Sequence, residues 1–288
     1  MPPFHRALAA LDYSHLGDGA LEVARALCEA LDLPLALAHV YETPWYAYPE
    51  IELGAMGGGD PAAIEGWFRE KAGRLLEARL AELGPRASGE VIEGTPIHRV
   101  LGEHAAAIGA DLLVAGTHGR SAPGRFLLGS VAETLLRTAG IPLLVVPEGG
   151  EARFRAGAPI VCATDFSAPA RDGVRIAAAL ALALGAPLEL VHVERSQPGD
   201  PERRESERLL AYEAENLEAS HPGLTVGTHL RYGDASSTIV ELAEHHGAGL
   251  VVIGTRGEKS LARVLVGSVT DRVIRRSSVP VLAIPPGA

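Results

Sequence analysis

Two glycine-containing segments carry the residue types best suited to binding an anion. The first reads Gly116-Thr117-His118-Gly119, then nine residues, then Gly129-Ser130, and the second reads Gly254-Thr255-Arg256-Gly257, then nine residues, then Gly267-Ser268. Glycine allows a backbone to approach a ligand closely, and a helix that starts after the last glycine offers unpaired N–H groups and the positive end of its dipole. The pattern favours phosphate binding. Turn glycines followed by an ordinary serine cap are the simpler alternative for one copy.

Other nucleotide-binding motifs do not fit these segments. A Walker A loop needs a lysine before its last Ser or Thr, and the stretch from Gly124 to Ser130 has the glycine spacing without that lysine. A dinucleotide-binding fold needs Gly-x-Gly-x-x-Gly after the first strand, and the residues after Asp12 and Asp165 lack it. Neither segment has a recognisable general base beside it, so we expect no fast phosphoryl transfer and assign no catalytic residue.

The two segments belong to a longer internal repeat. Residues 110–147 align with residues 248–285 at a constant offset of 138, with 15 identities in 38 positions and no gap. Earlier in the chain the offset is 153, so that Asp12 falls on Asp165 and His39-Val40 falls on His192-Val193. An alignment this long in one register indicates a duplication. The sequence predicts one domain at 1–147 (repeat 1), a glycine-rich linker at 148–157, and a second domain at 158–288 (repeat 2).

Each repeat alternates apolar runs with segments of helical spacing. In repeat 1 the runs predict strands at 7–11, 35–40, 90–92, 112–115 and 142–146, and the periodicity predicts helices at 17–31, 61–83, 96–108 and 129–138. Strands that alternate with helices form right-handed βαβ units around a parallel sheet. Ligands of such sheets bind beyond the carboxyl ends of the strands. Asp12 and Asp165 end the first strands and Gly116 and Gly254 end the fourth, although either aspartate could instead cap the following helix.

These features together resemble the tandem form of the universal stress protein family. Both copies match the family's ATP-binding motif G-x2-G-x9-G-[S/T], and the resemblance covers nearly the whole chain. The family fold implies two doubly wound α/β domains, each with a five-stranded parallel sheet of order 3-2-1-4-5 flanked by helices. That order places the first and fourth strands side by side, where the crevice is expected.

The resemblance implies a nucleotide site in each repeat. Asp12 and Asp165 would hydrogen-bond adenine, and Val40 and Val193 would pack beside the base. The residues implied beside ribose and phosphate are Gly116, Thr117, His118 and Gly119 in repeat 1 and Gly254, Thr255, Arg256 and Gly257 in repeat 2. Those implied to hold the phosphates are Gly129, Ser130 and Val131, and Gly267, Ser268 and Val269. Unequal affinities are expected, because Arg256 is always charged whereas His118 is not, and Glu258 replaces Arg120.

Composition and local pattern disfavour several other classes of protein. The formal net charge is −10, with 36 acidic and 26 basic residues, which disfavours nucleic acid. No apolar run reaches the ~18 residues of a membrane span, and the first residues lack a signal-peptide pattern. The two cysteines, Cys28 and Cys162, stand in apolar runs and form no disulfide framework. We expect a globular cytoplasmic protein with reduced thiols.

The sequence therefore favours an ATP-binding stress or signalling module, with Mg²⁺ or Mn²⁺ held mainly through the phosphates and no protein metal ligands assigned. A slow ATPase or self-phosphorylating enzyme, with Ser130 or Ser268 as acceptor, is one alternative, and an interaction scaffold without nucleotide is another. The repeats are expected to pack as an internal pseudo-dimer, and the family resemblance implies their last strands as the candidate contact. A further homo-oligomer and an unknown protein partner remain open.

Two local features have competing interpretations. Repeat 1 has 14 more positions than repeat 2 between Val40 and Gly94, and its segment 42–60 holds aromatic residues and a triple glycine. This segment is either a lid or partner surface, or a plain surface loop. The pair His245-His246 suggests metal binding, but adjacent helical residues do not face each other, so we expect a solvated helix end.

Overall fold

The computed structural model describes residues 2–12, 15–42, 61–117, 128–149, 154–196, 199–255 and 266–288. The elements of repeat 1, in chain order, are β1 (Ala7–Ala10), α1 (His15–Leu31), β2 (Leu35–Tyr41), α2 (Pro61–Leu83), β3 (Ala87–Glu93), α3 (Ile97–Ile108), β4 (Leu112–Gly116), α4 (Ser130–Thr138) and β5 (Leu143–Val146). Those of repeat 2 are β6 (Ile160–Ala163), α5 (Ala168–Leu184), β7 (Leu188–Glu194), α6 (Asp200–Ser220), β8 (Val226–Tyr232), α7 (Ala235–His245), β9 (Leu250–Gly254), α8 (Ser268–Arg276) and β10 (Val281–Ile284).

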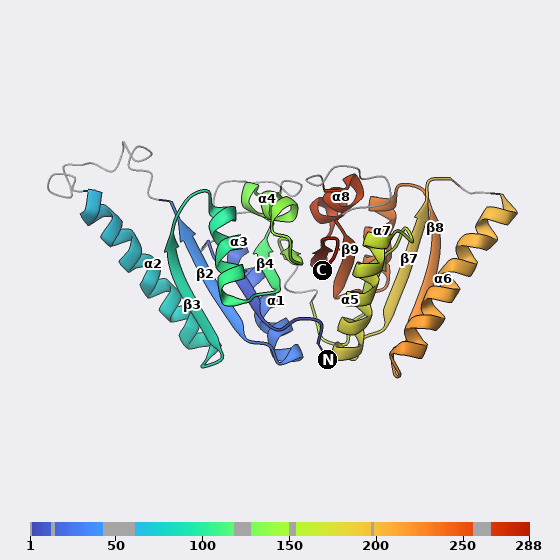
Figure 1. Cartoon of the computed structure of the whole chain (residues 1–288), viewed down its shortest axis with the longest axis horizontal. Helices are drawn as coiled ribbons and strands as arrows, with labels where there is room; N and C mark the ends of the chain where they lie inside the picture. The colour runs from blue at the N-terminus through green and yellow to red at the C-terminus, as the bar shows by residue number, and fades with distance from the viewer. Residues whose placement is uncertain are drawn as a thin grey trace.

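The strands form one ten-stranded sheet in the order β3-β2-β1-β4-β5-β10-β9-β6-β7-β8. Within each repeat all neighbouring strands are parallel and follow the order 3-2-1-4-5, which confirms the predicted fold class. The last strands of the repeats, β5 and β10, pair antiparallel, with Leu144 opposite Leu282. The internal pairing is therefore a continuous sheet with α2 and α6 at its two outer ends (Figure 1).

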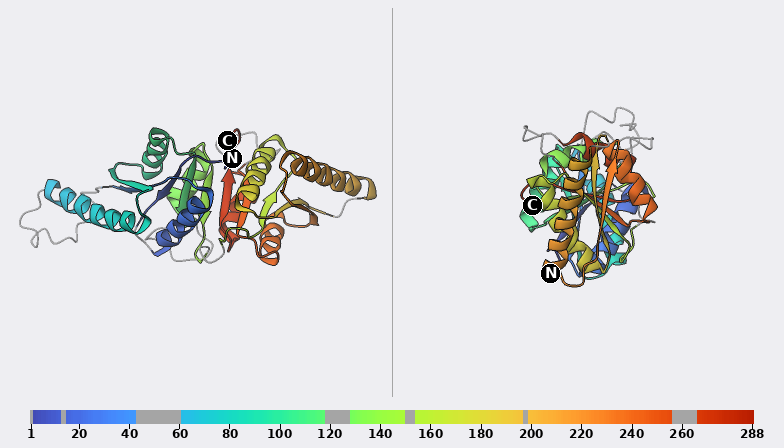
Figure 2. Two further views of the ribbon diagram at one scale, coloured as in Figure 1. Left: turned by 90° about the horizontal axis from the view of Figure 1, so that it is seen from below. Right: turned by 90° about the vertical axis from the view of Figure 1, so that its right-hand side faces the viewer.

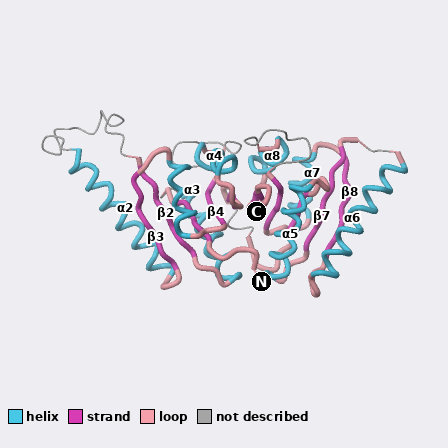
Figure 3. The backbone as a smooth tube through the Cα atoms, in the orientation of Figure 1, coloured by secondary structure: helices cyan, strands magenta, loops and turns pink. Residues whose placement is uncertain are grey.

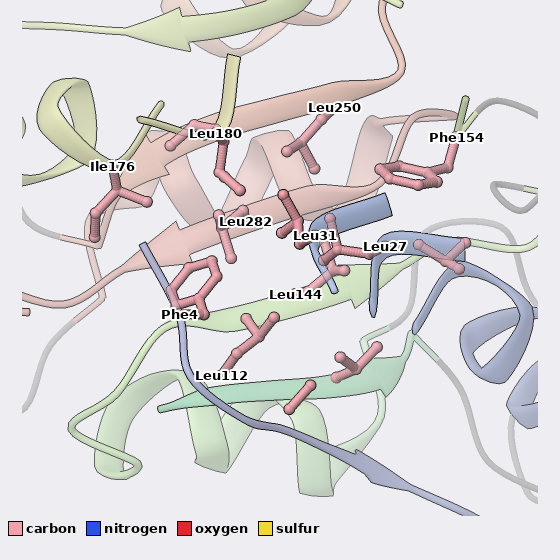
Figure 4. Close-up of a cluster of buried hydrophobic side chains, with 14 of the residues drawn as sticks. Phe4, Leu27, Leu31, Leu112, Leu144, Phe154, Ile176, Leu180, Leu250 and Leu282 are labelled. Atoms are coloured by element: carbon pink, nitrogen blue, oxygen red, sulfur yellow. The ribbon is translucent and has the colours of Figure 1, made fainter. Parts of the chain in front are cut away.

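Helices cover both faces of this sheet, as the end view in Figure 2 and the backbone trace in Figure 3 show. One apolar cluster packs side chains of α1, α2, α5 and α6 against the strands, and a second packs those of α3, α4, α7 and α8 against the other face. Both clusters run through the two repeats. In the first, Phe4, Leu144 and Leu282 lie together beside the junction (Figure 4). Burial of this shared apolar surface holds the repeats together.

Most predicted boundaries lie within one or two residues of the observed ones, and the differences at β3 and α3 have clear physical reasons. β3 extends over Ala87–Glu93 rather than 90–92, because it is an edge strand with many exposed side chains and so lacks an apolar run. The helix predicted at 96–108 starts one residue later, at Ile97. Pro96 precedes it as the N-cap residue, with an extended backbone of φ −74° and ψ 144°.

The two cysteines lie in the core as free thiols. Burial raises the pKa of Cys28 to about 12 and also raises the pKa of Cys162, so neither thiol forms the reactive thiolate near neutral pH. Both side chains therefore act as small apolar groups in the core. In the part of the chain that the structure describes, no helix is both long enough and apolar enough to cross a membrane.

Candidate functional site

In repeat 1 the carboxyl ends of three strands meet at one edge of the sheet. Ala10 of β1 pairs with Ala38 of β2. Two residues further along, Asp12 and Val40 follow at the same level on the two chains. Gly116 is the last residue of β4, which pairs with the other side of β1. The fold thus brings these three predicted site residues to neighbouring positions.

Repeat 2 repeats this register. Ala163 of β6 pairs with Val191 of β7, and Asp165 and Val193 follow two residues later. Gly254 ends β9, which pairs with the other side of β6. Because parallel strands end at one edge, the second set occupies the equivalent place in its own repeat.

The two valines contribute to the core beneath this edge. Val40 is buried, and Val193 is half-buried and packs against the same apolar cluster. Their side chains therefore help to hold the strand ends in place, whatever else lies against them. Any contact with a base would involve the small part of each side chain that reaches the surface.

Two buried threonines connect the strand ends to the helices that follow the glycine segments. The carbonyl of Thr117 accepts a hydrogen bond from the N–H of Gly129 at 2.6 Å, and that of Thr255 accepts one from Gly267 at 2.8 Å. Both threonine side chains belong to residues that are only 5% exposed. Each bond closes the chain on itself, so that the start of the helix is held beside the end of the fourth strand.

The helices at this edge each begin with an exposed serine that follows a glycine N-cap. Their first residues are Gly129, Ser130 and Val131 for α4 and Gly267, Ser268 and Val269 for α8. Neither N-cap glycine can supply a capping side chain, and both serines are exposed. The first N–H groups of an α-helix have no partner within the helix, and with the helix dipole they attract anions.

Gly267 is not required by the fold itself. Its φ is −61°, which any residue can adopt. A Cβ built there would lie 3.5 Å from the Thr255 carbonyl oxygen and 3.8 Å from Thr270 Oγ1, which are ordinary contact distances. Neither backbone conformation nor packing explains the absence of a side chain. A glycine here leaves the helix N-terminus accessible to another molecule.

The strand-end aspartates have different surroundings in the two repeats. Asp165 Oδ1 accepts a hydrogen bond from the N–H of Ser167 at 3.1 Å, and Ser167 Oγ in turn accepts one from Ala170. Ser167 is the N-cap residue of α5, so the alternative that Asp165 caps this helix is wrong. In repeat 1 the Asp12 carboxylate occupies the space where a Cβ on Gly17 would stand.

A strained turn in repeat 2 was not apparent from the sequence. Phe166 has a φ of +61°, in the left-handed region that non-glycine residues seldom adopt. Its N–H donates to Thr164 Oγ1 at 3.1 Å, Arg171 donates to its carbonyl, and its ring lies 4.6 Å from that of His192. Such outliers gather at functional sites, where the surrounding structure maintains them. The sequence offers no signal for it beyond the proximity to Asp165.

The histidines at the ends of the second strands serve the fold. His39 Nδ1 donates to the carbonyl of Leu11 at 2.8 Å, and His192 Nδ1 donates to that of Thr164 at the same distance. Each bond satisfies a carbonyl directly before a strand-end aspartate. Both histidines are therefore hydrogen-bonded to the backbone at the strand ends.

Repeat 2 carries an additional charged network beside α8. Asp234 caps α7 and lies 2.9 Å from Arg272 and 3.6 Å from Arg276. Arg272 also donates from Nε to the carbonyl of Ser268, one turn earlier. The hydroxyl of Ser236 bonds to Asp234 and holds the pKa of that carboxyl well below its usual range. Two guanidinium groups therefore stand within one or two turns of the candidate phosphate position.

Some predicted site residues lie outside the described residues. These are His118, Gly119, Arg256 and Gly257, together with Arg120 and Glu258, which carry the predicted asymmetry, and most of the 42–60 segment. The ends of the two glycine segments are described, and the Thr117–Gly129 and Thr255–Gly267 bonds fix where each begins and ends.

The fold and the strand-end geometry define a duplicated, doubly wound α/β protein with an anion-attracting helix N-terminus in each half. The model of the universal stress protein family matches residues 3–147 and 158–285. The chain belongs to that family.

Relatives match across almost the whole length. A universal stress protein of Mycobacterium tuberculosis is 26% identical over 298 residues, covering 92% of this chain and 94% of that protein. Among solved structures, a universal stress protein from Archaeoglobus fulgidus is 20% identical with a TM-score of 0.72 and covers 98% of both chains. Another structure from that organism is a universal stress protein in complex with dAMP, 27% identical, covering 45% of this chain and 99% of that one, with a TM-score of 0.38.

Proposed function

We propose that each repeat binds one molecule of ATP at the carboxyl edge of its strands. The observation that carries the proposal is the pair of helix N-termini that start at Gly129 and Gly267 without a side-chain cap. Gly267 in particular is not needed by backbone or packing, so its lack of a side chain is explained by a ligand that approaches there. Phosphate is the ligand that such a helix start favours.

Each phosphate group is held by backbone N–H groups of the first helical turn and by an exposed serine hydroxyl, Ser130 in repeat 1 and Ser268 in repeat 2. These are neutral donors, which is compatible with an acidic chain of net charge −10. Mg²⁺ or Mn²⁺ is bound through the phosphates rather than by a set of protein ligands. Asp12 and Asp165 bond the adenine, and the surface-reaching part of Val40 and Val193 lies beside it.

ATP acts here as a signal and not as a rapidly consumed substrate. Occupancy at 100 times Kd stabilises a folded protein by about 2.7 kcal/mol. We take residues 1–147 and 158–288 as the two nucleotide-binding domains and 148–157 as the linker. Because their sheets are continuous, nucleotide in either half can bias one shared surface, to which a protein partner or a second copy binds in the cytoplasm.

The direct test is to denature freshly purified protein and to chromatograph the nucleotide that it releases. We expect two equivalents of ATP from the wild type. Gly267→Ala should lose one equivalent while its circular dichroism and melting temperature without nucleotide stay unchanged, since the Cβ has room. Gly102→Ala is the matched control, because a Cβ at this position in α3 meets nothing within 4 Å. Two equivalents retained by Gly267→Ala would contradict the site.

The remaining outcome is protein that carries no nucleotide. If ATP also fails to raise the melting temperature when it is added back, the interaction scaffold is the correct function. The experiment therefore separates these two functions without knowledge of the partner.

Slow self-phosphorylation is a second candidate, favoured by the exposure of Ser130 and Ser268 at the phosphate position. Incubation with γ-labelled ATP should then label the wild type and not the Ser130→Ala/Ser268→Ala double variant. Equal labelling of the two proteins over hours, or none in either, rules this activity out.

A further inference from the structure

Repeat 2 contains a cluster of three metal-ligating side chains far from the candidate nucleotide edge. Glu189 comes from β7, His229 from β8 and His246 from the residue that follows α7. One ligand atom from each lies within 4.8 Å of the others. All three residues are half-buried, so they are sheltered but reachable by an ion. From this arrangement we propose a binding site for a divalent transition-metal ion, of which Zn²⁺ is the best match.

The backbone geometry explains why the side chains meet. Glu189 lies opposite Gly227 in the β7–β8 ladder, and Val191 lies opposite His229. Residues two apart in a strand share a face, so Glu189 and His229 both project from the face that carries Val191 and is covered by α7. The Glu189 carboxylate occupies the space left by Gly227, where a Cβ would collide with it. The glycine is therefore required for this position of the carboxylate.

α7 brings the third ligand to the same place. It runs back along the sheet from Asp234 and ends so that the His246 ring lies 4.8 Å from the His229 ring, at an interplanar angle of 68°. His245 is exposed, as predicted for a solvated helix end, but that prediction was wrong for His246. The His246 ring lies between its neighbours: it is 5.4 Å from the exposed His245 ring and 4.8 Å from the His229 ring of β8.

The charges and donor atoms suit Zn²⁺. Imidazole nitrogen and carboxylate oxygen are both good zinc ligands, at about 2.0–2.2 Å. Two ligands of one tetrahedral zinc lie about 3.4 Å apart by that geometry. Glu189 Oε2 and His229 Nε2 are now 2.7 Å apart and share a hydrogen. A zinc ion takes the place of that hydrogen, the pair opens slightly, and rotation of the half-buried His246 side chain supplies the third bond. Water completes the tetrahedron.

One positive group opposes the ion. Arg231 Nη2 lies 3.4 Å from His229 Nδ1. Arg231 is exposed, so it can turn away when Nδ1 takes up the hydrogen that zinc displaces from Nε2. Its charge should still weaken the site. Removal of the Arg231 side chain should therefore raise the zinc affinity, whereas removal of a ligand should lower it.

The equivalent position of repeat 1 provides an internal negative control. The offsets of the duplication match Glu189 with Ala36 and His246 with Ile108, and the strand register matches His229 with Glu90. Repeat 1 thus has one possible ligand where repeat 2 has three. His104 lies 3.7 Å from Glu90, and no third metal-ligating side chain joins this pair in the part of the chain that the structure describes.

The experiment uses full-length, tag-free protein stripped of metal and nucleotide. Titration calorimetry with ZnCl₂ should give one equivalent, and Co²⁺ should give the visible absorption of a tetrahedral complex. His246→Ala should weaken zinc binding more than about tenfold. Glu189→Gln, which keeps a hydrogen-bond acceptor for His229, should do the same. Arg231→Ala should tighten binding. His245→Ala and His104→Ala should leave it unchanged.

The position of His246 at a half-buried helix end makes His246→Ala the variant most certain to fold, and the melting temperature of each metal-free variant checks this directly. The proposal is overturned if the wild type shows no saturable zinc binding. It is equally overturned if His246→Ala and Glu189→Gln bind zinc as the wild type does. Neither result bears on ATP, because none of the three side chains belongs to the candidate nucleotide site, whose residues follow the strand ends.

Discussion

The two repeats have the same backbone at their candidate nucleotide edges and different side-chain chemistry around it. The N-cap residues of α4 and α8 have φ and ψ of −61° and 146°, and −61° and 142°. The threonine–glycine bonds that anchor them are 2.6 and 2.8 Å long. Beside α8, however, Asp234 pairs with Arg272 and Arg276, and an offset of 138 places threonines at both arginine positions in α4.

A second difference lies between the first two helices of each repeat. In repeat 1, Arg79 of α2 and Asp18 of α1 form an ion pair at 2.5 Å. The offset of 153 matches Asp18 with Arg171, and the matching apolar positions of α2 and α6 place Arg79 opposite Glu213. The signs of both charges are therefore exchanged in repeat 2. There the pair does not close, since Arg171 bonds to the Phe166 carbonyl and Glu213 Oε2 is buried without a partner.

This comparison shows which properties duplication preserved. The strand order, the helix entry and the threonine anchors depend on backbone geometry and on apolar packing, and they are the same in both halves. Ion pairs at the surface contribute little to stability, so the residues that form them can differ between the repeats with little loss of stability. We therefore expect the largest effects from changes in shared features and the smallest from changes in the features that differ.

The strongest disruption should come from the junction of the two sheets. Leu144 and Leu282 face each other across β5 and β10, and both are almost fully buried. Replacement of either by Ala should lower the free energy of unfolding by about 2–5 kcal/mol. Urea unfolding should show similar losses for the two variants and a non-additive double variant, because the residues touch. Separate unfolding transitions for the two halves would mean that the junction does not couple them.

The next largest effect should come from a β-branched side chain at either N-cap glycine. Gly129→Val and Gly267→Val should each weaken ATP binding in one repeat about 100-fold, which corresponds to about 2.7 kcal/mol. Calorimetry should then report only the untouched site. Gly129→Val leaves the repeat 2 site beside α8, and Gly267→Val leaves the repeat 1 site. If the charges around α8 strengthen ATP binding, Gly129→Val should bind ATP more tightly than Gly267→Val. Identical affinities would show that only the shared backbone determines binding.

A smaller effect is expected from Glu213, and its sign depends on pH. Burial raises the pKa of Glu213, while Arg171 opposes this shift. The folded protein therefore holds this proton at a pH where the unfolded chain has lost it, so the free energy of unfolding falls as pH rises from the unfolded pKa through the raised folded pKa.

Glu213→Gln should accordingly stabilise the protein by about 1 kcal/mol at pH 7. The gain should shrink as the pH falls through the unfolded pKa and vanish well below it, where both states of the wild type are protonated. Denaturant unfolding at a series of pH values measures this difference. Glu215→Gln is the matched control, because Glu215 is exposed on the same helix. If Glu213→Gln stabilises the protein equally at every pH, the burial of the Glu213 charge is not the cause of the stabilisation.

The smallest effect should come from the ion pair that joins the repeats. Arg275 of α8 lies 3.5 Å from Glu133 of α4 and 3.0 Å from Asp271 of its own helix. Glu133→Gln should cost about 0.2–1 kcal/mol, and less in high salt. Unfolding at low and at high ionic strength tests this. A decrease of more than 2 kcal/mol in the free energy of unfolding would mean that charges, rather than the apolar junction, hold the repeats together.

The sequence was most informative where burial in the fold directly determines the local pattern of apolar residues. Continuous apolar runs identified β4 and β9, because strands covered on both faces are apolar throughout. It was less informative at β3, where exposed side chains break the pattern. It also gave no signal for the positive φ of Phe166, whose N–H donates to Thr164 Oγ1 and whose carbonyl accepts from Arg171. The serine that caps α5 could not be told apart from Asp165, since both residue types cap helices.

By itself the sequence determined the duplication, the order of elements and the residues that follow the strands, because each of these is set by spacing along the chain. Only the tertiary structure decided the antiparallel register in which β5 and β10 join the halves in one sheet, and that Gly267 has room for a side chain it lacks. It also brought Glu189, His229 and His246 together from three separate elements. Contacts between segments that are distant in the sequence depend on strand register and helix direction, which no local pattern contains.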